Sequence, residues 1–465
     1  MRIALFLACA AAASRFVGLA ESPPGFYIDE AATAMHLICL GETGADAEGV
    51  RFPLFSRVLG GGYSTPIYLY FGTAWISLLG VSVPSFRALA AFFNVLTIAG
   101  LYFLALRLFG SRAAAWTGLA AALSPWSFQL SRVAWDPPLA PCLLIWGIYF
   151  LIRSSKSLDA AVSGALLVLA AYSYPPLRAQ IPLMILPLLY LKKAVSGLER
   201  KSLICLTLTG AVLAIPLVIQ TLSSEFMARS HALSIFSDLH IRMPGSDSWL
   251  AITGAFLVNM LRHLSPGFLF LRGDANLRHS TGFTGQLGWV DSLALVLGAA
   301  YALGIRQRPS GPSKDEADRL FRPAMLVWMS GILAGIVPAA LTWEGLPHAL
   351  RSIGAWPFCS LVTGLLLWRV ASVWRKIGPA ILVVSVLFFS LFLAHYFTDY
   401  RDKAARSFEA ATVEAAKRAR ETGDWAGFEK QARGRIQDLA LRGYLVLYGG
   451  ESCRSSEQEL QDLRE

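Results

Sequence analysis

Apolar segments of roughly 20 residues recur along this 465-residue chain and constrain its fold more than any other feature of the sequence. A helix of about 20 apolar residues crosses the roughly 30 Å hydrocarbon core of a bilayer and satisfies its own backbone hydrogen bonds. Charged residues make up only 15% of the chain, and its mean hydropathy is +0.51. Soluble domains usually contain about 25% charged residues. The sequence therefore predicts an all-α polytopic membrane protein.

Eleven segments have the length and apolarity expected of membrane-spanning helices. The first, 3–19, resembles a secretory signal because Arg2 precedes an alanine-rich core, but Arg15 interrupts that core and favours a retained helix. A further apolar segment, 65–82, has to be placed separately. The other expected spans are 87–106, 113–128, 138–152, 158–174, 181–191, 203–222, 289–305, 323–341, 353–368 and 377–395.

The positive-inside rule decides how the segment 65–82 is placed. If 65–82 does not cross the membrane, every second connection is basic, and the short loops between them hold single arginines. We therefore expect 65–82 to lie in or dip into the outer interface, with its Tyr and Trp side chains at headgroup depth. An ordinary span is the alternative. The basic connections contain Arg107 and Arg112; Arg153 and Lys156; Lys192, Lys193, Arg200 and Lys201; Arg306, Arg308, Lys314, Arg319 and Arg322; and Arg369, Arg375 and Lys376.

This topology places the amino terminus inside and the carboxyl terminus outside. It predicts a membrane unit over 1–397, with a first outer loop at 20–86 and a large outer loop at 223–288, followed by an outer tail at 398–465. The tail combines helical periodicity with mixed charge, so we expect one or two small packing helices there. The chain has no clear internal repeat, which counts against a transporter built from symmetric halves.

The net charge of +10 does not indicate a nucleic-acid partner, because the chain has no basic run with interleaved aromatic residues. In a polytopic membrane protein, surplus Lys and Arg set the orientation and contact anionic lipid. The absence of any CxxC motif argues against a zinc site and against a disulfide framework. A bridge between Cys39 and Cys453, the two cysteines outside the apolar segments, stays open.

Two adjacent acids, Asp29 and Glu30, follow the first apolar segment in SPPGFYIDEAATAMHLICLGETG, residues 22–44. The topology places them outside, and the run 30–40 predicts a helix with Asp29 at its N-cap. Asp29, Thr33 and His36 recur at i, i+4 and i+7 and therefore share a face. A carboxylate at a helix N-terminus stays ionised at neutral pH and accepts aligned hydrogen bonds, which suits a general base. A plain N-cap beside a solvated Glu30 is the alternative.

The stretches PPGFYIDEAA, FPLFSRVLGGGYSTPIYLY, LLGVSVPSFRALAAFFNVLTIAGLYFLALRLFG and LSPWSFQLSRVAWDPPLAP occur in this order. In order and spacing they resemble the GT-C glycosyltransferases, in particular the protein-mannosyltransferase and aminoarabinose-transferase relatives that use polyprenyl-phosphate sugars. The resemblance covers about the first 220 residues well and extends loosely beyond them. It implies a GT-C-like fold with interfacial juxtamembrane helices in the first outer loop.

The resemblance also implies roles for individual acids. Asp29 matches the catalytic acid that deprotonates the acceptor hydroxyl, and Glu30 matches a neighbour that orients the site or helps to hold a divalent cation. Asp136, in SRVAWDPP, falls in the second outer loop, where relatives carry another functional acid, with a helix N-cap as its alternative. YSTPIY stands where eukaryotic protein mannosyltransferases carry His-Pro-Pro, which weakens the case for a protein acceptor.

A lipid-phosphate sugar donor needs cations on the outer face to offset its phosphate charge, and arginine suits phosphate oxygens best. Arg351 is the favoured candidate because His348 lies one turn before it; Arg278 with His279 comes second, and Arg132, near Asp136, third. For each arginine, a side chain snorkelling at a helix end is the alternative. No HxH or HExxH pair predicts a metal site, but a divalent cation (Mg, Mn or Zn) held by Glu30 or Asp136 with a distant His stays open.

The sequence as a whole predicts a membrane glycosyltransferase that moves a sugar from a polyprenyl-phosphate donor to an acceptor hydroxyl on a glycan, lipid or protein. Asp29 is the expected general base. The expected location is the bacterial inner membrane, with the active site on its outer face. The alternative is a transporter or flippase of a lipid-linked saccharide; a polymerase or ligase of lipid-linked glycans would use similar residues.

Overall fold

The structure is a computed structural model that describes residues 1–154, 156–237, 248–302, 314–374, 376–433, 435–450 and 452–453. Three of the basic residues expected on the inside, Arg306, Arg308 and Arg375, lie outside the described residues.

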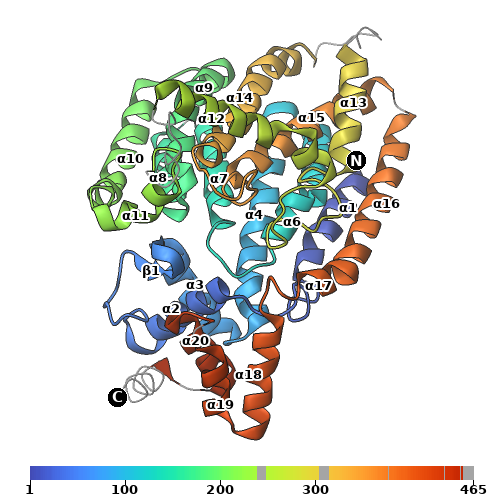
Figure 1. Cartoon of the computed structure of the whole chain (residues 1–465). Helices are drawn as coiled ribbons and strands as arrows, with labels where there is room; N and C mark the ends of the chain where they lie inside the picture. The colour runs from blue at the N-terminus through green and yellow to red at the C-terminus, as the bar shows by residue number, and fades with distance from the viewer. Residues whose placement is uncertain are drawn as a thin grey trace.

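Helices make up almost all of the described structure (Figure 1). One antiparallel hairpin, β1 (Ser56–Val58) and β2 (Gly62–Ser64), pairs Ser56 with Ser64. The α-helices are α1 (Arg2–Ala13), α2 (Ile28–Thr43), α3 (Pro66–Leu79), α4 (Val83–Phe109), α5 (Ser111–Leu123), α6 (Pro125–Leu130), α7 (Leu139–Arg153), α8 (Ser157–Ser173), α9 (Pro175–Ser196), α10 (Arg200–Thr221), α11 (Ser224–Leu233), α12 (Trp249–Leu264), α13 (Trp289–Ala302), α14 (Lys314–Ala340), α15 (Trp356–Val373), α16 (Ile377–Phe397), α17 (Asp399–Ala404), α18 (Ala410–Thr422), α19 (Trp425–Ala432) and α20 (Asp438–Tyr444).

Within the described residues, five helices are long and apolar enough to cross a membrane: Val83–Phe109, Arg200–Thr221, Arg319–Ala340, Ile353–Val373 and Ile377–Phe397. They mark the chain as a membrane protein, but the predicted count of eleven spans is not confirmed. Several of the predicted spans form helices of 12 to 17 residues, such as α1, α5, α7 and α8. At about 1.5 Å per residue, helices of that length do not reach the roughly 30 Å of a hydrocarbon core.

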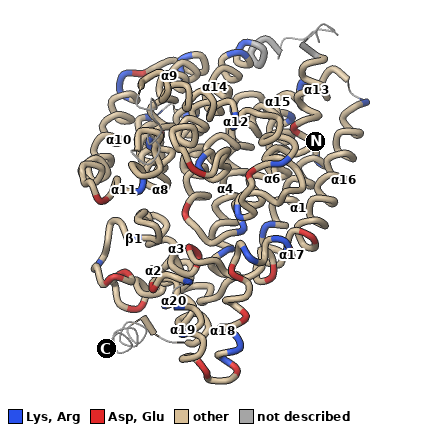
Figure 2. The backbone as a smooth tube through the Cα atoms, viewed as in Figure 1, with Lys and Arg blue, Asp and Glu red and all other residues tan. Residues whose placement is uncertain are grey.

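Several helices carry basic residues at one end, although Arg87 and Arg178 lie near the opposite ends of α4 and α9. Arg107 ends α4, Arg153 ends α7 and Lys193 lies in the last turn of α9, whereas α10 begins at Arg200 and α16 follows Lys376. Figure 2 shows blue segments at the top of the molecule, near the upper ends of α10 and α16, and few charges along these two helices. This one-sided charge is the pattern that the positive-inside rule associates with the cytoplasmic face.

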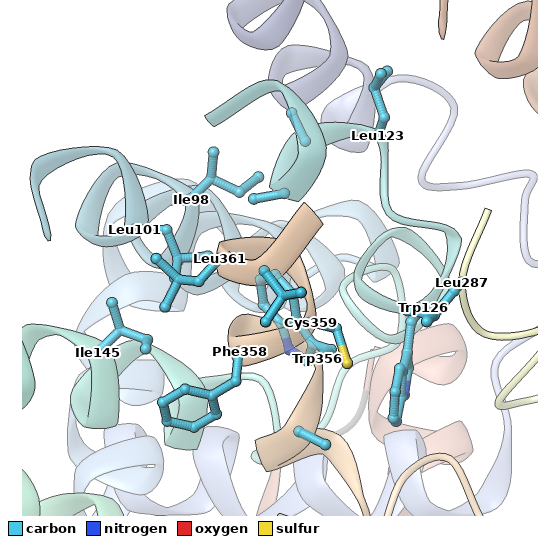
Figure 3. Close-up of a cluster of buried hydrophobic side chains, with 14 of the residues drawn as sticks. Ile98, Leu101, Leu123, Trp126, Ile145, Leu287, Trp356, Phe358, Cys359 and Leu361 are labelled. Carbon is cyan, nitrogen blue, oxygen red and sulfur yellow. The ribbon is translucent and has the colours of Figure 1, made fainter. Parts of the chain in front are cut away.

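The core of the helical bundle is a large apolar cluster that joins helices distant in the chain. Figure 3 shows Ile98 and Leu101 of α4, Ile145 of α7 and Trp356 and Phe358 of α15 within this cluster. Glycines allow close contact there, because a Cβ at Gly364 of α15 would meet the Thr117 backbone of α5 at 2.4 Å. Packing in this cluster fixes the positions of the helices whose ends carry the polar residues described below.

The first outer loop folds into α2, the hairpin and α3. Helix α2 starts at Ile28, with Tyr27 as its N-cap, so the predicted N-cap role of Asp29 is wrong: Asp29 is the second residue of the helix. The apolar segment 65–82 forms α3, a helix of 14 residues packed on α2, which is too short for a full span. Its interfacial location stays a prediction.

The tail contains more helices than the one or two predicted, because α17, α18, α19 and α20 all follow α16. Figure 1 shows α18 to α20 below the helical bundle, beside α2 and α3. Helix α20 packs closely on α2: a Cβ at Gly443 would meet the Ala31 carbonyl oxygen at 2.3 Å. The disulfide that the sequence left open is formed, and Cys39 of α2 is joined to Cys453. The tail therefore packs against α2, the helix that carries Asp29, and is covalently linked to it.

Candidate active site

A cavity of about 780 Å³ lies where the first outer loop, the large outer loop and the ends of several bundle helices meet. Helix α2 contributes Asp29 and Thr33 to its wall, and the connection from α6 to α7 contributes Asp136. The other walls come from the hairpin, the start of α9, helix α11, the connection before α13 and the connection after α14. The cavity thus gathers residues that are far apart in the sequence.

Asp29 lies half-buried at the start of α2, where its carboxylate accepts a hydrogen bond from the Tyr27 hydroxyl. Burial raises the pKa of Asp29 above its usual range, while the Tyr27 hydrogen bond and the charges of Arg229 and Arg278 oppose the rise. Burial also raises the pKa of Tyr27, so this phenol keeps its proton and donates. A carboxylate with a raised pKa is a stronger base than a solvated one, as general base catalysis near neutral pH requires.

Glu30 does not line the cavity; it is fully buried and points into the fold. Its oxygens accept from Arg87 Nε and Nη2, both at 2.9 Å, from the Tyr27 backbone N–H at 3.0 Å and from the Ala134 N–H at 2.8 Å. A carboxylate offers about four lone-pair sites, and all four are used. The structure therefore does not fit Glu30 as a solvated acid or as a metal ligand; Glu30 positions its neighbours.

Asp136 lies near Asp29, and burial raises the pKa of Asp136 to about 7, with the negative charge of Asp29 adding to the rise. The arginines Arg178 and Arg229 act in the opposite direction. The cavity therefore holds two neighbouring carboxyl groups whose pKa values are both raised by burial. Such pairs are typical of sites that carry out acid–base chemistry.

The raised pKa of Asp136 predicts a stability effect. Between about pH 4 and pH 7 the folded protein holds a proton that the unfolded chain has released, so ionisation destabilises the folded state as the pH rises through that window. We expect Asp136→Asn to raise the unfolding temperature at pH 8, and to raise it by less than half as much at pH 5, where only part of the window has been crossed. Roughly three pKa units at about 1.4 kcal/mol each give an upper value of about 4 kcal/mol. Tryptophan fluorescence during heating measures the effect, with exposed Asp402→Asn as control. Equal gains at both pH values would contradict it.

Four arginines line the cavity: Arg178, Arg229, Arg278 and Arg351. Each guanidinium donates to a neutral oxygen, as Arg229 does to the Leu59 carbonyl at 2.6 Å. Within the described part of the chain, none of the four forms an ion pair with a carboxylate at 4.0 Å or less. The four arginines outnumber the acids that line the same cavity, Asp29, Asp136 and Glu344. Such an excess of positive charge favours an anionic ligand.

Arg132, which the sequence proposed for donor phosphate, is fully buried and does not line the cavity. All five of its N–H groups donate inside the protein, so none is free for a phosphate. Its role is to join the first outer loop to the bundle. The acceptors are the carbonyl oxygens of Ser14, Arg15, Gly18 and Ser22 and the hydroxyl of Tyr396.

Like the arginines, the candidate histidines either line the cavity or are buried away from it. His279 and His348, which the sequence proposed for donor phosphate, line the cavity with ring centroids 4.6 Å apart. His36, which was expected on the Asp29 face, is fully buried and contacts the Arg57 carbonyl at 2.6 Å. Thr33 does reach the cavity beside Asp29.

Sequence reasoning missed Arg229 and Asp274. Arg229 lies on α11, and its charge lowers the pKa values of Asp29 and Asp136. Its only signal in the sequence is its position in the large outer loop. Asp274 accepts from His279 Nδ1 at 2.9 Å and from the Ala349 N–H at 2.8 Å. Asp274 and His279 are five residues apart in one loop, and this short spacing could have predicted that they contact each other.

No protein-family model matches the chain, and no curated protein does. In structure it is similar to ArnT from Cupriavidus metallidurans bound to undecaprenyl phosphate: 15% identity, TM-score 0.48, covering 97% of this chain and 87% of ArnT. The apo form of ArnT gives 15% identity and a TM-score of 0.47, covering 95% of this chain and 83% of ArnT.

The chain is also similar to the oligosaccharyltransferase AglB from Archaeoglobus fulgidus in complex with an inhibitory peptide and a dolichol-phosphate: 12% identity, TM-score 0.46, covering 93% of this chain and 59% of AglB. ArnT and AglB are both GT-C glycosyltransferases, the class that the sequence resembles. At these values the similarity transfers neither a substrate nor a catalytic residue, so the function has to be argued from the side chains of the cavity.

Proposed function

We propose that this protein is a membrane glycosyltransferase that moves a sugar from a polyprenyl-phosphate donor to an acceptor hydroxyl. The observation that carries the proposal is the composition of one cavity. Two carboxyl groups with raised pKa values, Asp29 and Asp136, lie near arginines that form no ion pair with a carboxylate among the residues that the structure describes. A base for a hydroxyl and cations for a departing phosphate are what this reaction requires.

The reaction is a single displacement. The acceptor oxygen attacks the anomeric carbon of the donor sugar, and its proton passes to the carboxylate of Asp29. The bond between the anomeric carbon and the phosphate oxygen breaks, and its electron pair stays on the phosphate. Arg351, Arg278, Arg229 and Arg178 stabilise that growing charge. The protonated form of Asp136 donates a hydrogen bond to a reacting oxygen. This displacement inverts the configuration at the anomeric carbon.

A lipid carrier fits the surroundings of the cavity. Apolar side chains of Phe226, Leu233, Phe236 and Leu341 share its wall with the charged groups. Helices α4, α7 and α9 carry Arg107, Arg153 and Lys193 at the ends away from Asp29 and Asp136. At the near ends, Arg87 is buried and Arg178 lines the cavity. By the positive-inside rule the cavity then faces the outside of the cell. We propose that the membrane is the bacterial inner membrane.

The test is a transfer assay on the full-length protein in proteoliposomes with a panel of radiolabelled polyprenyl-phosphate sugars and glycan, lipid and peptide acceptors. We expect at least one donor to lose its sugar to an acceptor and to release free polyprenyl phosphate. Movement of an intact donor between leaflets without cleavage would instead support a transporter or flippase. Joining of lipid-linked glycans without any monosaccharide donor would support a polymerase or ligase.

A further inference from the structure

A second group of chemically reactive side chains lies at the wall of the cavity. Asp274, His279 and His348 each offer one ligating atom, and these atoms lie within 4.8 Å of one another. Asp274 and His279 are buried, and His348 is half-buried. Asp274 and His279 come from the connection before α13, and His348 comes from the connection after α14. Two loops that are far apart in the chain therefore build one cluster.

The surrounding backbone holds Asp274 in a defined position. Asp274 Oδ1 accepts from the Asn276 N–H at 2.8 Å, and Oδ2 accepts from the Ala349 N–H at 2.8 Å and from His279 Nδ1 at 2.9 Å. The distance from Asp274 Oδ2 to His348 Nδ1 is 4.0 Å. The contact with Asp274 Oδ2 therefore fixes the orientation of the His279 ring.

His348 is supported from its backbone side. Its N–H donates to His263 Nε2 at 3.0 Å, and the other nitrogen of His263 contacts the Asn259 carbonyl of α12 at 2.8 Å. The ring of Trp135 lies 6.0 Å from the ring of His279, centroid to centroid. The backbone of His348 and the ring of His279 thus each contact a further residue, while both side chains line the cavity.

We propose that Asp274, His279 and His348 bind one divalent transition-metal ion of the zinc class. Two imidazole nitrogens and one carboxylate oxygen suit zinc, whereas magnesium and calcium prefer sets of oxygen ligands. Around a tetrahedral ion with bonds of about 2.0–2.1 Å, ligand atoms lie about 3.4 Å apart. The distances from Asp274 Oδ2 to His279 Nδ1, 2.9 Å, and to His348 Nδ1, 4.0 Å, bracket this value.

The fourth coordination position of such an ion is open to the cavity, because His279 and His348 both line it. Sites with three protein ligands keep a position for water or for an anionic oxygen. The arginines Arg278 and Arg351 lie in the same wall and are one and three residues away from these histidines. The metal site does not depend on the proposed transfer reaction, and it differs from a cation held by Glu30, whose oxygens are occupied.

The test is direct metal binding to the purified full-length protein after removal of metal with a chelator. Zinc content at equilibrium gives the stoichiometry and affinity, and cobalt gives a visible absorption spectrum that reports tetrahedral coordination. We expect one ion per chain. Removing a residue that only supports a metal ligand weakens metal affinity by about 10–100-fold. Because His279 and His348 are proposed as ligands themselves, His348→Ala and His279→Ala should each weaken zinc binding by about 100-fold or more.

The matched control is His231→Ala, which removes an exposed histidine on α11 and should leave binding unchanged. Absence of zinc and cobalt binding by the wild-type protein would overturn the proposal, and this outcome does not depend on how any variant folds. Equal affinity in wild type, His348→Ala and His279→Ala would also overturn it. Neither result bears on sugar transfer, because no donor is present in the assay.

Discussion

Asp29→Asn is expected to lower kcat/KM for sugar transfer by about 10²–10⁴-fold, the range contributed by a positioned general base. Asparagine has nearly the shape of aspartate and can still accept a hydrogen bond from Tyr27, but its amide cannot take a proton from the acceptor hydroxyl. The position of Asp29 at the cavity wall and its raised pKa point to this role. Initial rates of polyprenyl phosphate release from a labelled donor provide the measurement.

The matched control is Glu48→Gln, which removes an exposed carboxylate from the same outer loop. This variant should transfer sugar at the wild-type rate. Equal transfer by wild type and Asp29→Asn would remove Asp29 from the mechanism. The loss in Asp29→Asn should appear in kcat with a nearly unchanged KM for the donor, because donor binding depends on the arginines.

The pH dependence of the wild-type enzyme follows from the same carboxylate. The base must be ionised to accept a proton, so activity falls as the pH drops through the pKa of Asp29. Burial raises that pKa above the usual range, so the acid limb of the kcat/KM profile should lie above the value of about 3.9 for a solvated aspartate.

Local pattern was enough to predict the helical class. The apolar stretches behind α4, α10, α15 and α16 are continuous, and their length and composition identify them without any tertiary information. The start of α2 was less predictable, because Asp29 suits an N-cap as well as the first turn of a helix. The reciprocal bond from the Tyr27 N–H to Glu30 at 3.0 Å settles the start at Ile28.

The sequence could not predict which arginines are buried in the protein and which line the cavity. Arg132 and Arg351 are both single arginines in short outer loops, yet Arg132 is fully buried and Arg351 lines the cavity. What separates them is the set of carbonyl groups within reach, and those belong to residues more than 100 positions away, such as Ser14 and Gly18 for Arg132. Pairing over such distances leaves no periodic signal, and the same holds for Asp274 with His348.

Breaking the buried Glu30–Arg87 pair is expected to cause the largest loss of stability. Both side chains are fully buried, and two hydrogen bonds of 2.9 Å join them. Removing one partner leaves an uncompensated buried charge, which typically costs about 3–5 kcal/mol. We therefore expect Arg87→Met and Glu30→Gln each to lower the unfolding temperature sharply. The double variant should lose less than the sum of the two, because it leaves no lone charge. Additive losses would show that the two groups act independently.

The pair also determines where the two proposed catalytic carboxyl groups stand, so its loss should reach the chemistry. Glu30 is the direct neighbour of Asp29, and its Oε1 also accepts from the Ala134 N–H, two residues before Asp136. Arg87 adds three bonds to the carbonyls of Leu19, Pro23 and Gly25, which lead into α2. Glu30→Gln protein that stays folded should show a reduced kcat for sugar transfer, because Asp29 and Asp136 both lose the Glu30 carboxylate that fixes their backbone. The exposed Glu48→Gln variant should change neither kcat nor stability. A folded Glu30→Gln enzyme with wild-type kcat would mean that Asp29 and Asp136 are positioned by the apolar core alone.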